Sequence, residues 1–235
     1  MTGMVEDFDI PSVDRGEVLR YLGHAGQDIP PDLDARIDDA VARCMEVARP
    51  RGVTRVFDVD LPSSSPGRVA LAGAALTLDG RDISAHLGGA TAAGLLAVTL
   101  GIGIDRELRL LSATDPLAQV VLDAAATALV ERAADAAEAL LVGEAASRGL
   151  FANDRYSCGY GDFPLDEQRS FVSTLDAGRL LGLGLTPSNL LVPTKSVTAV
   201  LGMFGEPQPG MPALCPKCHC HDFCTIRATG RTCRG

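Results

Sequence analysis

A ten-residue segment, Arg155 to Pro164, combines side chains that could bind a small polar ligand. The guanidinium of Arg155 can donate two parallel hydrogen bonds to a carboxylate. Gly159 and Gly161 lack side chains, so backbone groups can approach a flat ligand closely. Tyr160 adds an aromatic face and a hydroxyl. The segment therefore predicts a loop suited to a zwitterionic amino acid joined to an aromatic group.

A second concentration of reactive side chains lies at the C-terminus. Within ten residues the sequence places two imidazoles and four thiols, those of Cys215, Cys218, Cys220 and Cys224. Closely spaced thiolates bind zinc or an iron–sulfur cluster. The single residue between Cys218 and Cys220 fits poorly with a pair of zinc knuckles, so an iron–sulfur cluster stays open beside zinc. The alternative is a reduced tail that binds metal only weakly.

The loop has a family likeness. The loop resembles the S-adenosylmethionine loop of the activation domain of cobalamin-dependent methionine synthase. The resemblance lies in the order of Arg155, three further residues, Gly159 and Tyr160. Segments 183–186 and 193–199 resemble the part of that domain downstream of the loop, and 13–23 resembles its beginning. The similarity covers most of residues 10–205 and is dense over 150–203.

The resemblance implies a set of ligand residues. Arg155 would bind the ligand carboxylate, and the backbone of Ser157 and Gly159 would contact the adenosine. Tyr160 would complete the wall of the site. The acidic partners implied for the ammonium group or the ribose hydroxyls are Glu131 and Asp14. No side chain is expected to act as a catalytic acid or base, and Lys195 and His86 are given no catalytic role.

The sequence itself supports Glu131. An Ala-rich helix is expected here. One slowly drifting stripe of it contains Val121, Ala124, Ala128, Glu131, Asp135 and Glu138. A carboxylate beside such a face of small side chains needs a polar partner, and a ligand ammonium or hydroxyl group would serve.

The chain departs from the family in three ways. Cys158 stands where the family usually has proline, and the family's second ligand tyrosine, beyond the last strand, has no counterpart. The sequence also lacks a cobalamin-binding signature. By resemblance, the chain would therefore act in trans on a partner that carries cobalamin.

The expected function is to bind S-adenosylmethionine and support the reductive remethylation of a cobalamin-dependent methionine synthase or related corrinoid methyltransferase. The family implies a flavodoxin or ferredoxin-type electron donor. The chain would thus be an accessory component of a methyltransferase. The alternative is a non-catalytic protein whose metal-binding tail serves docking or electron relay for a corrinoid methyltransferase.

Hydrophobic periodicity and turn residues predict the elements that would position these groups. The glycines at 101–103 are expected to form a loop with no helix directly behind them, which argues against a dinucleotide-binding fingerprint. The fold class is α+β, with helices packed on a mixed, mainly antiparallel, twisted sheet. The helices are expected at 13–22, 32–49, 83–94, 116–148 and 165–181, and the strands at 53–61, 69–78, 95–100, 190–192 and 197–204.

Composition sets the remaining expectations. Residues 1–205 should form the α+β domain, 206–212 a linker and 213–235 the Cys-rich tail. A formal net charge of −9 and an aromatic content of 4% argue against nucleic-acid binding. No apolar run is long enough to span a membrane, and the acidic N-terminus does not resemble a signal peptide. We expect a cytoplasmic protein, in which clustered cysteines favour metal or redox use over disulfides.

Overall fold

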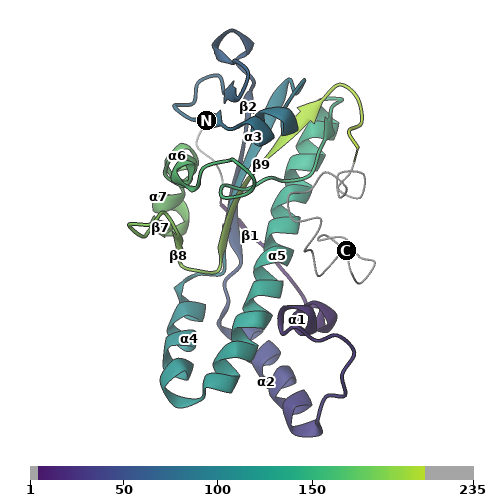
Figure 1. The fold of residues 1–235 in the computed structure, drawn as a ribbon, viewed down its shortest axis with the longest axis vertical. Helices are drawn as coiled ribbons and strands as arrows, with labels where there is room; N and C mark the ends of the chain where they lie inside the picture. Colours follow the sequence, from purple (N-terminus) through teal and green to yellow (C-terminus); the bar gives the residue numbers. More distant parts are fainter. Residues whose placement is uncertain (1–4, 210–235) are drawn as a thin grey trace. The chain divides into compact units, whose positions relative to one another are not determined.

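A computed structural model describes residues 5–209 of the chain (Figure 1). The longest of the described helices is α5, which Asp115 caps through a hydrogen bond from the backbone N–H of Ala118 (3.1 Å). Two short 3-10 turns, η1 (Leu61–Ser63) and η2 (Leu165–Glu167), accompany the α-helices. The α-helices are α1 (Arg15–Tyr21), α2 (Pro31–Val47), α3 (Arg81–His86), α4 (Ile102–Thr114), α5 (Pro116–Ser147), α6 (Gln168–Thr174) and α7 (Ala177–Leu181).

Five strands form one sheet in the order β1-β2-β5-β9-β6. The pairings at its two edges, β1 with β2 and β6 with β9, are antiparallel. Two further hairpins pair β3 with β4 and β7 with β8. The strands are β1 (Val5–Asp7), β2 (Arg51–Asp58), β3 (Arg68–Ala70), β4 (Thr77–Asp79), β5 (Ala92–Thr99), β6 (Phe151–Ala152), β7 (Gly184–Leu185), β8 (Leu191–Val192) and β9 (Ser196–Phe204). The α+β class with a mainly antiparallel sheet is confirmed.

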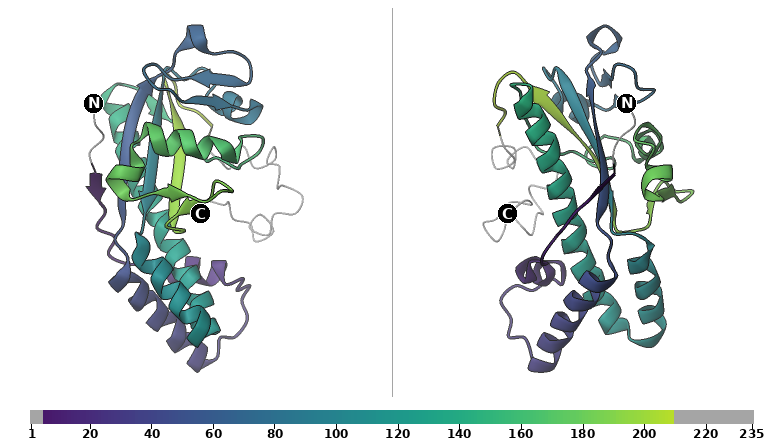
Figure 2. Two further views of the ribbon diagram at one scale, coloured as in Figure 1. Left: turned by 90° about the vertical axis from the view of Figure 1, so that its left-hand side faces the viewer. Right: turned by 180° about the vertical axis from the view of Figure 1, so that it is seen from behind.

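The chain divides into two compact units. The first comprises Met1–Arg55, Leu95–Leu140 and Gln168–Thr198, and its helices α2 and α4 contact one another (Figure 2). Ile37, Ala40 and Cys44 recur at helical spacing on the buried side of α2. That periodicity explains why the predicted helix at 32–49 is confirmed.

The second unit comprises Val56–Gly94, Leu141–Glu167 and Ala199–Gly235. Here α3 packs against β3 and β4, with Leu78 and Ile83 fully buried. Strands β2, β5 and β9 and helix α5 contribute residues to both units. All eight residues of β5 are buried, as expected for an interior strand without solvent-facing positions.

Several expected elements are wrong. The strand predicted at 69–78 is the hairpin of β3 and β4, because Gly73 turns the chain with a φ of +72° between small residues. The helix predicted at 83–94 ends at His86, and β5 begins at Ala92. Ala and Gly, which dominate this stretch, do not separate helix from strand by pattern alone.

One helix was missed, and another is divided into shorter pieces. Gly101, with a φ of +79°, does not lead into a loop, because α4 begins at Ile102 directly behind it. The helix predicted at 165–181 divides into η2, α6 and α7, since Asp176 adopts a left-handed φ of +54°. Among the described residues, none of the helices is long and apolar enough to cross a membrane.

Candidate functional site

The loop that carries Arg155 begins as an extension of the sheet. The backbone of Tyr156 pairs with Val200 of β9 in both directions, at 2.7 and 2.9 Å. Asn153 pairs with Gly202 in the same way, through its backbone N–H (3.1 Å) and its side-chain Oδ1 (2.7 Å). Arg155, half-buried, therefore lies between two residues whose backbones are fixed to a buried strand.

Beyond Tyr156 the chain makes a tight turn. The N–H of Gly159 donates to the carbonyl of Phe163 (2.9 Å), and the N–H of Phe163 donates to the carbonyl of Tyr160 (2.9 Å). The carbonyl of Ser157 accepts from Tyr160 (3.3 Å). Gly159 and Gly161 have φ values of +89° and +54°, which favour glycine. The turn buries Phe163 and leaves Tyr160 65% exposed.

Four rings gather around this turn. The ring of Tyr156 lies 5.1 Å from that of His86 on α3, 6.1 Å from Tyr160 and 6.3 Å from Phe163, measured between centroids. The aromatic packing places the exposed ring of Tyr160 beside the half-buried ring of Tyr156. Such a surface suits a flat ligand, as the sequence analysis expected of Tyr160.

Asp162 closes the turn against α3. Its carboxylate accepts from the backbone N–H groups of Arg81 and Asp82, each at 2.9 Å. The bonds from Asp82 and Arg81 lower the pKa of the Asp162 carboxyl below its ordinary value of 3.8. Asp162 is therefore ionised throughout the neutral range, and this cap is lost only when the pH falls below that ordinary value.

Cys158 is buried within the second unit. Its side chain is buried, and burial raises the pKa of the thiol to about 12, with a further contribution from the charge of Glu167. The group is thus a neutral thiol near pH 7 and packs as a small apolar side chain.

The other two predicted ligand residues, Asp14 and Glu131, belong to the first unit. Asp14 caps α1, because its Oδ1 accepts from the N–H of Gly16 (2.7 Å). Glu131 lies half-buried on α5, on the same stripe as buried Ala124 and Ala128.

Tyr21, at the end of α1, belongs to the surroundings of Glu131. Burial raises the pKa of the Tyr21 hydroxyl, and the charge of Glu131 adds to the rise. The guanidinium carbon of Arg20 lies 4.2 Å from the centre of the Tyr21 ring, and Arg20 also pairs with Glu17. The first unit thus holds a mixed group of acidic, basic and aromatic side chains around Tyr21.

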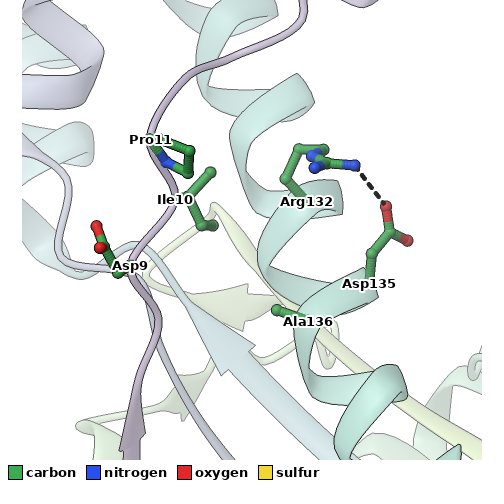
Figure 3. A pocket seen from close by; sticks show the side chains of 6 residues that line it. All are labelled: Asp9, Ile10, Pro11, Arg132, Asp135 and Ala136. Atoms are coloured by element: carbon green, nitrogen blue, oxygen red, sulfur yellow. Dashed lines mark ion pairs between the residues drawn. The ribbon is translucent and has the colours of Figure 1, made fainter.

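A cavity of about 260 Å³ opens beside the same helix. One wall is the extended segment Asp9, Ile10 and Pro11, and the other is formed by α5 (Figure 3). Arg132 and Asp135 face one another across 4.0 Å at its rim. The cavity adjoins the part of α5 that carries Glu131, but it has few buried polar groups that could select a ligand.

The predicted site residues therefore form two sets. Arg155, Ser157, Gly159 and Tyr160 lie together on one loop of the second unit, whereas Asp14 and Glu131 lie in the first. Sequence reasoning missed that Asp82 and Asp162 accept from each other's backbone N–H groups, and that Tyr156 packs against His86. Asp82 and Asp162 are 80 positions apart, and such a contact leaves no local pattern in a single sequence. The turn from Gly80 to Asp82 could, however, have suggested the start of a helix.

No group of three or more His, Cys, Asp or Glu side chains within residues 5–209 is arranged to hold a metal ion. The metal ligands predicted in the tail, Cys215, Cys218, Cys220 and Cys224, lie outside the described residues. The described cysteines, Cys44 and Cys158, are both buried and reduced.

Comparison with known proteins gives a match at the level of structure. No family model matches the sequence, and no curated protein does. A solved structure, the crystal structure of the MetH reactivation domain bound to AdoHcy, is similar to this chain with a TM-score of 0.59. The similarity covers 88% of this chain and 81% of that one at 16% sequence identity, which establishes a shared fold.

Proposed function

We propose, from the premise that this chain has the fold of the MetH reactivation domain, that it binds S-adenosylmethionine at the loop 155–160. The solved domain is bound to AdoHcy, which is S-adenosylmethionine without its transferable methyl group. The observation that carries the proposal is the coincidence of this fold with the sequence order Arg155, three residues, Gly159 and Tyr160. A shared fold alone would not select a ligand.

The loop has the chemistry that such a ligand needs. Arg155 would bind the carboxylate of the amino acid part through two hydrogen bonds. Gly159 has no side chain, so a ligand could approach the backbone there closely, and the exposed ring of Tyr160 offers an aromatic face. Asp14 and Glu131 are proposed as acidic partners for the ammonium group or the ribose hydroxyls.

The proposed role of the bound molecule is to remethylate a corrinoid protein in trans. Cobalamin would be carried by the partner, a methionine synthase or another corrinoid methyltransferase. An external donor of the flavodoxin or ferredoxin type would supply one electron to Co(II), and the methyl group would pass to the resulting Co(I). The chain's own contribution is positioning, since it holds the methyl donor at reaction distance.

The C-terminal cysteines extend this proposal. Cys215, Cys218, Cys220 and Cys224 are proposed to bind zinc or an iron–sulfur cluster, which could serve docking or electron relay. Anaerobic purification followed by metal analysis and visible absorption tests this part separately. A metal-free, colourless protein with full activity would remove the tail from the mechanism.

Replacing Arg155 by alanine tests the site. Because the guanidinium would supply the main contact to the ligand carboxylate, we expect Arg155→Ala to lower the affinity for S-adenosylmethionine at least about 100-fold. Isothermal titration calorimetry measures the affinity. In parallel, an assay with a Co(II) corrinoid protein, reductant and methyl-labelled S-adenosylmethionine should show methylcobalamin formation that depends on this chain.

Arg148→Ala is the matched control. Arg148 is an exposed arginine of the same unit that pairs with Glu144 on α5, and its loss should leave the affinity unchanged. Equal affinities of the wild type and the Arg155→Ala variant would contradict the assigned site. A wild-type chain that captures a corrinoid protein but does not bind S-adenosylmethionine would support the docking alternative instead.

A further inference from the structure

Helix α3 is bonded to the downstream end of the proposed ligand loop. Gly80, at the N-cap position of α3, provides no side-chain cap, and the first N–H groups of the helix bind the carboxylate of Asp162 instead. In return, Asp82 Oδ2 accepts from the N–H of Asp162 (3.2 Å). The two aspartates thus cap each other's backbone across 80 residues of sequence.

The other end of the same helix holds the upstream end of the loop. The backbone carbonyl of His86 accepts from Asn153 Nδ2 (2.8 Å), and His86 Nε2 lies 2.8 Å from the carbonyl of Asp154. A carbonyl oxygen only accepts, so His86 Nε2 carries the proton. Both ends of the loop are therefore fixed to one short helix. Asp154 is bonded to the last residue of α3, and Asp162 is bonded to the first.

The proposed ligand residues lie between these two attachments. Arg155, Ser157, Gly159 and Tyr160 all fall in the interval that begins at Asp154 and ends at Asp162. Within the interval, Gly161 lies so close to α3 that a Cβ at this position would overlap the Asp82 carboxylate. The same Cβ would lie 2.7 Å from the hydroxyl oxygen of Tyr156.

We infer that α3 is a brace for the ligand loop, with Asp82 and Asp162 as positioning residues that hold Arg155 and Tyr160 ready for S-adenosylmethionine. This inference rests on the proposed function. Neither aspartate need touch the ligand, because both act through the backbone of the turn.

The physical basis is the conformational freedom of the loop. Two glycines in nine residues allow many backbone conformations, of which only a few bring Arg155 and Tyr160 together. A loop that occupies the binding conformation for a fraction of the time binds with an affinity reduced by that fraction. The reciprocal caps exclude other conformations of the loop before the ligand binds.

Substitution of Asp162 by alanine tests the brace. We expect amide hydrogen exchange at residues 155–163 to speed up at least about tenfold without ligand, with little change in the strands of the sheet. We also expect the affinity for S-adenosylmethionine to fall about tenfold. Asp162→Asn keeps one of the two acceptor oxygens and should show an intermediate value in both measurements, which a general loss of folding would not produce.

Asp79→Ala is the matched control, because Asp79 is an exposed acid of the neighbouring strand β4 and pairs with Arg68. It should leave loop exchange and affinity unchanged. Unaltered exchange at residues 155–163 in Asp162→Ala would overturn the brace, and so would faster exchange with full affinity. A wild-type chain that binds no S-adenosylmethionine would instead refute the proposed function, while the exchange data would still decide whether α3 orders the loop.

Discussion

Gly161 shows how much of the loop depends on a single missing side chain. Its φ of +54° lies in the left-handed region, and its Cα faces the Asp82 carboxylate and the Tyr156 hydroxyl. Any L-amino acid here meets two separate penalties, one from the backbone conformation and one from overlap. From the sequence, Gly161 is expected to allow close approach of a ligand, whereas the structure shows it in contact with α3.

The two penalties can be separated by comparison with another glycine. Gly149, which follows α5, has a similar φ of +70° but no atom within 4 Å of an added Cβ. Gly149→Ala should therefore cost only the backbone penalty, about 1 to 2 kcal/mol. Gly161→Ala should cost more and also weaken S-adenosylmethionine binding.

Urea unfolding of both variants measures the difference. Equal losses of stability, with ligand affinity intact in both, would mean that the close approach of Gly161 to Asp82 has no consequence. A larger loss in Gly161→Ala, accompanied by weaker binding, is the result that the loop geometry predicts.

At the scale of elements, Lys195 ties the start of β9 to α5. Its side chain is only 13% exposed, and Nζ lies 2.8 Å from both Asp123 Oδ1 and Thr127 Oγ1. The Thr127 hydroxyl donates to the carbonyl of Asp123, so its lone pair is available to accept from Lys195. The sequence analysis gave Lys195 no catalytic role, and these contacts provide a structural one.

Lys195→Met keeps the apolar stem and removes the ammonium group. We expect a loss of about 1 to 2 kcal/mol in the free energy of unfolding, because the partly exposed Asp123 limits the strength of the ion pair. Arg148→Ala, which breaks an exposed pair within one helix, should cost about 0.5 kcal/mol or less. Similar losses in the two variants, measured by urea unfolding, would contradict the structural role of Lys195.

The elements that could be predicted from sequence are those with strong local signals. The cap at Asp115 followed by Pro116 marks the start of α5, and the periodic apolar positions of α2 mark its buried face. In contrast, the start of β5 and the whole of α4 were missed, because the stretch from Ala90 to Gly103 consists mainly of small and apolar residues. Buried strands and buried helices share that composition, and only tertiary contacts distinguish them.

At the scale of the whole molecule, the fold agrees with the MetH reactivation domain at only 16% sequence identity. The core contains few aromatic side chains, with Phe163 and Phe171 the largest that are fully buried in the described part of the chain. Many different sets of Ala, Val, Leu and Ile can fill the same volume, so a fold can persist while its sequence changes. If the loop binds the proposed ligand, its resemblance is explained, because ligand chemistry restricts residue types more than packing does.

The most direct test of the account is a crystal structure of this chain with S-adenosylmethionine. The account predicts the ligand carboxylate within hydrogen-bonding distance of the Arg155 guanidinium and the adenosine part against the backbone of Ser157 and Gly159. An empty loop at saturating ligand, or a ligand bound elsewhere with Arg155 directed away from it, would contradict binding at residues 155–160.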